Sequence, residues 1–364
     1  MSVSAGIVGL PNVGKSTIFN ALTAAGAEAQ NYPFCTIDPN HGVVAVPDKR
    51  LTRVTEFLPT QKVVPAFLEL VDIAGLVRNA AQGEGLGNQF LGHIKNVDAV
   101  AHVVRCFDDD NVTHVESGLN AVRDVDIVNT ELLVKDLETA ERAVERLGKA
   151  VKTGDKEAAP RLAVAQRVHD ALAAGTPART VLESDEDRRA VQELQLISAK
   201  PVLYVANIDE AGLESEPPVA AALRERAAAE GAECVALCGK LEAEIAELAP
   251  VEQVEFLESA GLSEPGLHVL SRALYRLLGL ETFFTASAPQ NTAWTVAAGT
   301  TAVKAAGVVH SDFEKNFVRA DVYTLSDLEE YGDEAGIRAA GKMRSEGRDY
   351  VVRDGDILFF RTSA

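Results

Sequence analysis

Residues 9–16 carry the residue types that bind a triphosphate. They read Gly-Leu-Pro-Asn-Val-Gly-Lys-Ser, which matches the pattern G-x-x-x-x-G-K-[ST]. Glycines let successive backbone N–H groups surround phosphates, Lys15 meets the charge of the β- and γ-phosphates, and Ser16 can ligate magnesium where a helix begins. The apolar run 5–8 predicts the strand that this motif requires. We therefore predict a nucleoside triphosphate site that includes Asn12, Val13, Gly14, Lys15, Ser16 and Thr17.

A second group of residues is predicted to surround magnesium and the γ-phosphate. Asp72-Ile73-Ala74-Gly75 directly follows an apolar run. Asp72 can hold magnesium through water, and Gly75 can donate its N–H to the γ-phosphate. Thr36 lies upstream, where a switch threonine would complete the magnesium shell with Ser16; a plain turn residue is the alternative for Thr36. These motifs occur in the order that a GTPase-type switch requires.

The predicted base-binding segment departs from the guanine-specific pattern. Guanine-selective sites carry Asn-Lys-x-Asp, whose aspartate accepts the N1 and N2 hydrogens of guanine, whereas this chain has Asn-Ile-Asp-Glu at 207–210. The lysine is missing and the acid is one carbon longer. Adenine has no N1–H and no C2 amino group, so such an acceptor loses its purpose. We predict that ATP binds at least as well as GTP, at a site that includes Asn207, Ile208, Glu210, Cys238 and Gly239.

Composition and charge restrict the classes of protein to consider. The 364 residues are 47 % hydrophobic and 24 % charged, which is ordinary for a chain of two or three domains. The net charge of −19 argues against nucleic-acid binding by the whole surface, so a ribonucleoprotein partner must be met by a local patch. No secretory signal, membrane span or cysteine spacing of a metal site is visible. We expect a cytoplasmic, monomeric protein without a membrane partner.

Apolar runs alternate with helical patterns in most of the chain. Five runs predict parallel strands, each with turn or site residues at its carboxyl end, at 5–8, 66–71, 99–104, 201–206 and 234–237. Between the third and fourth runs, residues 129–196 are rich in Ala, Glu, Lys and Arg. Apolar residues there repeat roughly every 3.5 positions, and a Thr-Gly-Asp break at 153–155 precedes a second apolar face. We predict an inserted antiparallel helical hairpin; amphipathic helices packed on the sheet are the alternative.

The region from residue 280 onward predicts a small α+β domain. Strand patterns occur at 292–296, 318–322, 350–352 and 357–360. Helical composition occurs at 326–331 and 333–346. An Asp-Gly turn at 353–356 predicts a tight hairpin between the last two strands.

Several motifs together resemble the YchF-type, Obg-related P-loop ATPases. They are the phosphate loop, Asn-Tyr-Pro-Phe-Cys-Thr-Ile-Asp-Pro-Asn at 31–40, Asp-Ile-Ala-Gly-Leu-Val at 72–77, Gly-Glu-Gly-Leu-Gly-Asn at 83–88 and the 207–210 segment. The resemblance spans the chain and implies an ATP-preferring hydrolase that binds ribosomes and is linked to translation and stress responses. Arg78-Asn79 departs from the family pattern, which has a small residue and then glycine there.

The same resemblance gives names to the predicted domains. The nucleotide-binding domain is a P-loop NTPase with a doubly wound α/β sheet, and the resemblance implies a coiled coil for the insert and a β-grasp TGS domain for the C-terminal region. The predicted boundaries are 1–128 with 197–279 for the nucleotide-binding domain, 129–196 for the hairpin and 280–364 for the TGS-like domain.

The residue after Asp-x-x-Gly bears on catalysis. Ras-like enzymes have a glutamine there that orients the attacking water, but Leu76 cannot hydrogen-bond, so slow hydrolysis is predicted. Asn12 stands where related enzymes hold potassium, whose charge could replace an arginine finger. His114 aligns with a histidine implicated in hydrolysis in this family, and a mobile loop could bring it to the water. A turn former and an exposed loop residue are the respective alternatives.

Two classes of function stay open at this point. One is a regulatory ATPase that slowly forms ADP and phosphate while its switch loops drive binding to a ribosome. The other is a nucleotide-gated binding module in which hydrolysis is incidental. An Obg-related GTPase is the alternative for the substrate, and Glu210 argues against it. A metabolic kinase is disfavoured because no second substrate site is legible.

Overall fold

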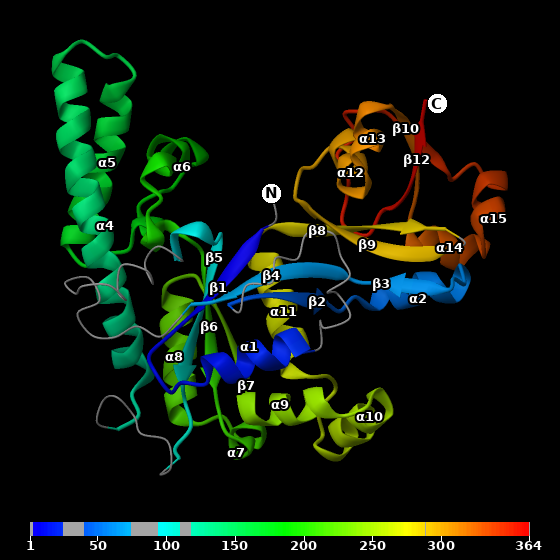
Figure 1. Ribbon diagram of the computed structural model, residues 1–364, viewed down its shortest axis with the longest axis horizontal. Helices are drawn as coiled ribbons and strands as arrows, with labels where there is room; N and C mark the ends of the chain where they lie inside the picture. Colours follow the sequence, from blue (N-terminus) through cyan, green and yellow to red (C-terminus); the bar gives the residue numbers. More distant parts are fainter. Residues whose placement is uncertain (1–2, 25–39, 74–93, 110–117, 288, 364) are drawn as a thin grey trace. The chain divides into compact units, whose positions relative to one another are not determined.

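The computed structural model describes residues 3–24, 40–73, 94–109, 118–287 and 289–363 (Figure 1). The chain divides into two compact units, 1–27 with 33–42 and 69–270, and 28–32 with 43–68 and 271–364. None of the described helices combines the length and the apolar character that crossing a bilayer requires.

The first sheet has the strand order β2-β4-β1-β5-β6-β7. Its strands are β1 Ser4–Val8, β2 His41–Val46, β4 Ala66–Asp72, β5 Ala99–Arg105, β6 Val202–Asn207 and β7 Glu233–Leu237. The neighbours β4–β1, β1–β5, β5–β6 and β6–β7 run parallel. Every residue of β1 and β5 is buried, as expected for parallel strands covered on both faces. The predicted P-loop fold is therefore confirmed.

The first unit also contains helices that precede and follow its strands. They are α1 Lys15–Ala24, α4 Ala121–Lys152, α5 Ala158–Ala173, α6 Asp185–Val191, α7 Glu210–Glu214, α8 Pro218–Ala229, α9 Gly239–Glu247, α10 Pro250–Ser259 and the start of α11 Gly266–Leu277. Val125 of α4 and Leu223 of α8 pack against Val104 and Tyr204 of the sheet. Since β1 lies between β4 and β5, the carboxyl end of β1 is a topological switch point, where α/β sheets bind ligands.

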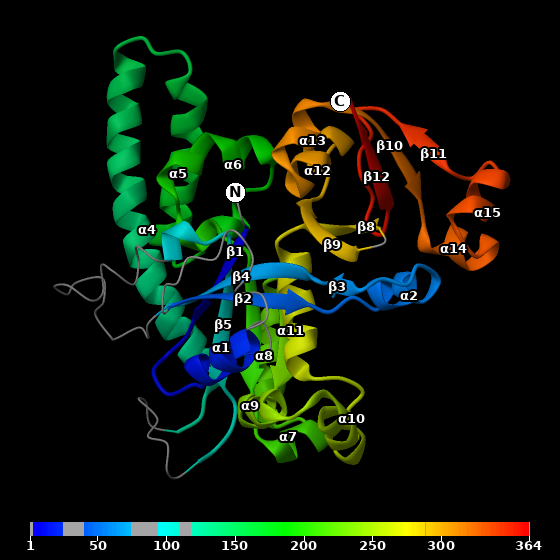
Figure 2. The same cartoon turned by 45° about the vertical axis from the view of Figure 1, so that its right-hand side comes forward.

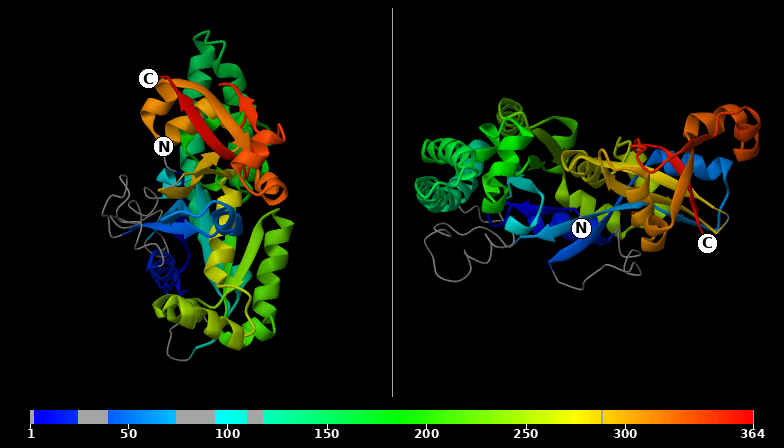
Figure 3. Two further views of the ribbon diagram at one scale, coloured as in Figure 1. Left: turned by 90° about the vertical axis from the view of Figure 1, so that its right-hand side faces the viewer. Right: turned by 90° about the horizontal axis from the view of Figure 1, so that it is seen from above.

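Helices α4 and α5 run side by side (Figures 1 and 2) and are seen end-on in the right-hand view of Figure 3. Helix α4 begins at Ala121, well before residue 129, because Asn120 caps it by accepting from Arg123 N at 3.0 Å. The predicted apolar seam is in place, with Ala140 and Val168 fully buried in a shared core. Gly154 has a φ of 92°, which suits the turn that follows α4.

Asp136 fixes the chain where it returns from α6 towards β6. Its carboxylate accepts from Ile197 N at 3.0 Å and from both N and Oγ of Ser198 at 2.6 Å. The side chain is almost fully buried, and this burial raises the pKa of Asp136 above its ordinary value. The three donors satisfy the buried carboxyl group, so they hold the ends of the helical insert together.

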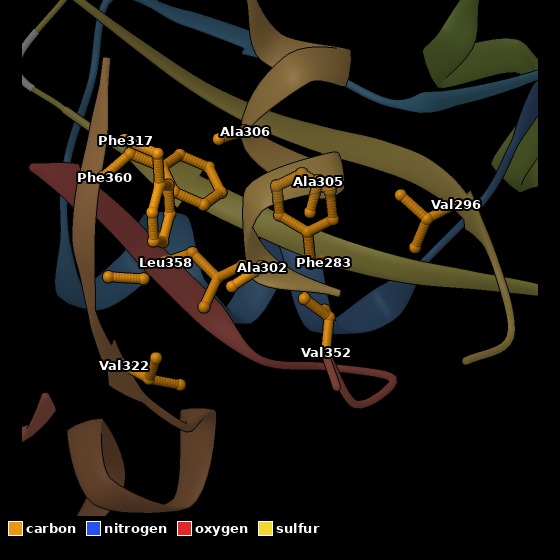
Figure 4. Close-up of a cluster of buried hydrophobic side chains, with 11 residues drawn as sticks. Phe283, Val296, Ala302, Ala305, Ala306, Phe317, Val322, Val352, Leu358 and Phe360 are labelled. Carbon is orange, nitrogen blue, oxygen red and sulfur yellow. The ribbon is translucent and has the colours of Figure 1, made fainter. Parts of the chain in front are cut away.

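The second unit contains a sheet of order β11-β10-β12-β8-β9-β3. Its strands are β3 Lys62–Val64, β8 Leu280–Ala286, β9 Gln290–Ala297, β10 Phe317–Tyr323, β11 Arg344–Glu346 and β12 Ile357–Thr362. Its helices are α2 Lys49–Phe57, α12 Ala302–Val309, α13 Ser311–Lys315, α14 Leu325–Tyr331 and α15 Glu334–Ala339. Phe283, Phe317 and Phe360 pack with the alanines of α12 in the core shown in Figure 4.

The prediction of one helical stretch at 333–346 is wrong. Helix α15 ends at Ala339, Gly341 has a φ of 69°, and Lys342 N donates to Ile337 O at 3.0 Å, which closes the helix end. Residues 344–346 then form β11, which pairs antiparallel with β10. A left-handed glycine and a partner strand thus override the helical composition.

The predicted hairpin at 353–356 is also wrong. Residues 350–352 contribute only an isolated bridge between Val351 and Thr301, while β12 pairs with β10 and β8. The Asp-Gly turn contacts β8: Asp354 Oδ1 accepts from Thr282 N at 2.9 Å, and Gly355 N donates to Thr282 O at 2.7 Å. The turn residues were recognised correctly, but their partner is a distant strand.

Residues 43–68 join the second unit, which the sequence did not predict. Strand β3 pairs in parallel with β9, and buried Asn291 donates to Leu58 O at 2.8 Å. Arg50 bridges Asp48 and Asp354, with nitrogen–oxygen distances of 2.7 Å to each. The chain between Thr36 and Asp72 therefore contributes a helix and a strand to the unit that contains the C-terminal region.

Candidate nucleotide site

The phosphate loop connects β1 to α1 and requires glycine at both motif positions. A Cβ at Gly9 would lie 2.3 Å from Val103 O, and one at Gly14, whose φ is 95°, would lie 2.2 Å from Asn207 Nδ2. Asn12 has a φ of 61°, a conformation that asparagine tolerates better than most residues. The loop therefore leads tightly into the N-terminus of α1, whose free N–H groups and dipole favour an anion.

Lys15 is held inside this loop. Its side chain is 7 % exposed, and Nζ donates to Leu10 O at 2.7 Å. Burial lowers the pKa of Lys15 to about 8, although the nearby Asp72 carboxylate acts in the opposite direction. A phosphate anion entering the loop would supply the negative charge that this buried ammonium group lacks.

Ser16 and Asp72 meet at the predicted magnesium position. Ser16 Oγ donates to Asp72 Oδ2 at 3.2 Å. Oδ1 of Asp72 is a buried oxygen for which the described residues offer no hydrogen-bond donor. Two hard oxygen groups beside a phosphate loop are what Mg²⁺ needs in a nucleotide site, so these residues fit the ion. Two further predicted residues of this group, Thr36 and Gly75, lie outside the described residues.

Asn207 ties the phosphate loop to the loop after β7. The side chain is buried; Nδ2 donates to Val13 O and Oδ1 accepts from Gly239 N, both at 2.9 Å. These two bonds bring together three of the predicted nucleotide-binding residues. The sequence pattern offered Asn207 as a base contact but gave no sign of this role as a clamp.

The other predicted base-binding residues lie in two adjacent loops. Ile208 is buried in the core and its N–H donates to Leu237 O, so neither its side chain nor its N–H is placed to serve a ligand. Glu210 begins α7 and pairs with Lys240 Nζ at 3.3 Å on the surface. Cys238 is buried before α9. The ion pair of Glu210 with Lys240 was missed, because the loop 238–240 was expected to act through its backbone.

His114 lies outside the described residues, whereas residues 105–109, nearer to β5, are described. Arg105, at the end of β5, is buried and donates to Phe107 O at 3.1 Å and to Asp109 O at 3.2 Å. Its guanidinium also lies over the Phe107 ring, 4.6 Å from the centroid. Arg105 thus fixes the backbone at Phe107 and Asp109, directly after β5.

Replacing Asn207 with alanine is expected to weaken both the fold and nucleotide binding. The substitution leaves Val13 O and Gly239 N buried without their partner, which costs about 2–4 kcal/mol of unfolding free energy. Because the phosphate loop loses a support, we expect nucleotide affinity to fall tenfold or more. Urea unfolding and equilibrium nucleotide binding measure the two effects.

Asp209→Ala is the matched control. Asp209 lies two residues after Asn207, is exposed, and caps α7 by accepting from Gly212 N at 2.9 Å. Loss of a cap costs about 1 kcal/mol, and its effect on nucleotide affinity should be much smaller than that of Asn207→Ala. Equal nucleotide affinity in the Asn207→Ala and wild-type proteins would contradict the clamp.

A phosphate loop at a switch point, with a buried lysine and a serine–aspartate pair beside it, defines a P-loop nucleoside triphosphatase of the GTPase fold. The family model described as "50S ribosome-binding GTPase" matches residues 4–135, and the C-terminal YchF-GTPase model, described as a protein of unknown function, matches 280–363. Chemistry and similarity therefore point to the same class.

Full-length relatives make the family definite. The chain is 49 % identical over 361 residues to the ribosome-binding ATPase YchF of Haemophilus influenzae and 49 % identical over 363 residues to that of Bacillus subtilis, with 99 % of each chain covered. A solved structure of the Schizosaccharomyces pombe YchF GTPase is 35 % identical, with a TM-score of 0.89 over 99 % of this chain and 98 % of that one. The chain belongs to the YchF family and is an NTP hydrolase.

Proposed function

We propose that this protein is a ribosome-associated regulatory ATPase that binds ATP in preference to GTP and slowly forms ADP and phosphate. The ribosome partner is supported by the names of the relatives, which are ribosome-binding ATPases. A ribosome partner also implies that the protein acts in the cytoplasm. The preference for ATP is supported by one observation in the base-binding loops, the pairing of Glu210 with Lys240.

This ion pair engages the carboxylate that a guanine-selective site would direct at the base. Glu210 Oε1 lies 3.3 Å from Lys240 Nζ, and the neighbouring carboxylate of Asp209 is used to cap α7. Guanine would need a carboxylate that accepts its N1 and N2 hydrogens, while adenine carries neither of them. Adenine therefore loses nothing from this arrangement, and guanine loses its main acceptor.

Hydrolysis in this proposal depends on charge at the phosphates. Ser16, and Asp72 through water, would hold magnesium, which would supply positive charge at the phosphates. Lys15 adds a second positive charge from within the loop. Leu76, which lies outside the described residues, provides no group to orient water, so we propose slow turnover with potassium at Asn12 or the imidazole of His114 as the substitute.

The first test is equilibrium binding of labelled ATP and GTP to nucleotide-free protein with magnesium, in potassium and then in sodium buffer. Tighter ATP binding supports the proposal, and clearly tighter GTP binding replaces it with an Obg-related GTPase. Turnover with and without ribosomes comes next. Stimulation supports a regulatory ATPase, while tight ATP binding with no stimulation favours a nucleotide-gated binding module.

Shortening the acid at position 210 is expected to move selectivity towards GTP. Glu210→Asp restores the side-chain length of the guanine acceptor and weakens the ion pair with Lys240. A charged hydrogen bond contributes about 1.5–3 kcal/mol, so we expect the ratio of GTP to ATP affinity to rise about 10- to 100-fold. Competition binding of the two nucleotides measures the ratio.

Glu214→Asp is the control, because it makes the same change at the exposed far end of α7. We expect its affinity ratio to equal that of the wild type. An unchanged ratio in Glu210→Asp as well would show that residue 210 does not select the base.

A further inference from the structure

Strands β10 and β12 present a group of arginines on the face of the sheet opposite α12. Leu358 and Phe360 point into the core beneath α12 (Figure 4). Side chains alternate along a strand, so Phe359 and Arg361 project from the other face. Together with Arg319, Asp321 and Arg338 they form a surface that we call the arginine face.

One carboxylate organises the three guanidinium groups of the arginine face. Arg361 donates to Asp321 Oδ2 from Nε and Nη2, both at 3.0 Å. Arg319 and Arg338 lie 3.5 Å and 3.8 Å from the same carboxylate. The Asp321 side chain is only 5 % exposed, whereas those of the three arginines are 41–55 % exposed. The Asp321 carboxylate is therefore buried, and the three guanidinium groups around it face solvent.

This arrangement has an excess of positive charge that folding alone does not explain. Arg319 and Arg361 are direct cross-strand partners, and like charges in that position are destabilising. Among these four side chains Asp321 offsets one of the three cations, so two positive charges remain; Glu334, on the same helix as Arg338, accepts from the Tyr323 hydroxyl. On a chain with a net charge of −19, such a local patch indicates an anionic partner.

An exposed aromatic ring lies within the same patch. Phe359 is 41 % exposed, is the cross-strand partner of Asp321, and has the Arg361 guanidinium 4.2 Å from its ring centroid. Flat aromatic and guanidinium groups on a sheet surface are the means by which proteins stack unpaired RNA bases, while adjacent arginines bind the phosphates. An acidic peptide would use the arginines but would have no need of the ring.

We propose that the arginine face binds a single-stranded segment of RNA, with a base stacked on Phe359 and Arg361 and phosphates at Arg319 and Arg338. This inference rests on the proposed function, since a ribosome presents such RNA, and it assigns one contact surface to that partner. It concerns β10, β12 and α15 alone and does not depend on the nucleotide site.

The test is fluorescence anisotropy with the full chain and a labelled ten-nucleotide unstructured RNA, measured over a series of salt concentrations. Phe359→Thr keeps a strand-forming residue and removes the stacking surface, and we expect affinity to fall about tenfold or more. Arg319→Gln removes one phosphate contact, so the slope of log K against log salt should become shallower by about 0.7, whereas Arg319→Lys should keep the slope. Asp321 stays paired with Arg361 in all three variants, which protects the fold.

Matched controls lie on α12, on the other face of the same sheet. Val308→Thr removes an exposed apolar group, since Val308 is 46 % exposed, and Lys304→Gln removes an exposed cation. Neither change should alter RNA affinity. The proposal is overturned if the wild-type protein does not bind the RNA, if Phe359→Thr and Arg319→Gln bind as the wild type does, or if a labelled polyglutamate peptide binds instead.

Co-sedimentation with ribosomes separates this inference from the proposed function. If the wild-type protein co-sediments with ribosomes but the variants bind RNA as the wild type does, the ribosome proposal stands and the arginine face is rejected. RNA binding that depends on Phe359, without co-sedimentation, supports the arginine face and rejects the ribosome as the partner.

Discussion

A Lys15→Met protein is expected to lose nucleotide turnover at least about 100-fold and yet to be more stable than the wild type without nucleotide. Methionine has a similar length and no charge, so the phosphates lose a cation. In the nucleotide-free protein the same change removes a buried ammonium group whose pKa is lowered from 10.5 to about 8 by burial. A shift of that size corresponds to about 3 kcal/mol at neutral pH, which is an upper limit for the gain.

The stability difference should depend on pH in a defined direction. The folded state releases the Lys15 proton near pH 8 and the unfolded chain releases it near its ordinary value of 10.5. Between these values the unfolded state binds more protons, so wild-type stability rises with pH relative to Lys15→Met. The difference is therefore largest below pH 8 and disappears above about pH 10.5. Urea unfolding of both proteins across this pH range measures the stability difference. The contributions of other titrating groups are the same in both proteins, so they cancel in the difference.

Lys15→Arg is the control that keeps the charge. Arginine stays protonated throughout this range, so the Lys15→Arg protein should not share the pH dependence of the wild type. A phosphate anion beside Lys15 should raise its pKa again, which predicts proton uptake on nucleotide binding and weaker binding above pH 8. A Lys15→Met protein that is less stable than the wild type at pH 7 would contradict the buried-charge interpretation.

The parts of the structure that sequence predicted best depend on local rules. The phosphate loop depends on local backbone conformation, because Asn12 and Gly14 have φ values of 61° and 95°, which few other residue types adopt readily. Strands β1 and β5 are buried on both faces and appear as continuous apolar runs. The apolar repeat of the helical insert likewise places Ala140 and Val168 in one buried cluster. In each case the pattern and the structure share one short-range cause.

The parts that sequence did not predict depend on partners far along the chain. Segment 43–68 joins β9 and Asp354 through β3 and Arg50, and no local pattern contains those partners. The Asp-Gly turn at 353–356 looks like a hairpin turn until Thr282 supplies its hydrogen bonds. Asn207 matched a base-binding motif, but its position shows that it also supports Val13 and Gly239. The residue types could be recognised from the sequence, whereas their contacts could be identified only from the folded structure.

Asp72→Asn is expected to weaken magnesium binding to the protein–nucleotide complex about 10- to 100-fold, the usual effect of removing a carboxylate that orders a metal ligand. The structure supplies the reason: Asp72 receives the Ser16 hydroxyl on one oxygen, and its other oxygen is buried with no donor among the described residues. Turnover should therefore require correspondingly more magnesium. Magnesium titration of nucleotide hydrolysis measures this shift.

Without magnesium the same substitution should have the opposite effect on nucleotide affinity. The Asp72 carboxylate repels a triphosphate once no metal lies between them, so Asp72→Asn should bind metal-free nucleotide more tightly than the wild type does. Asp98→Asn is the control, because Asp98 accepts from Ser4 N at 2.9 Å at the amino end of β5, remote from the phosphate loop. A carboxylate with only a structural role would weaken both forms of nucleotide equally when replaced. Opposite changes with and without magnesium can arise only if Asp72 acts through the metal.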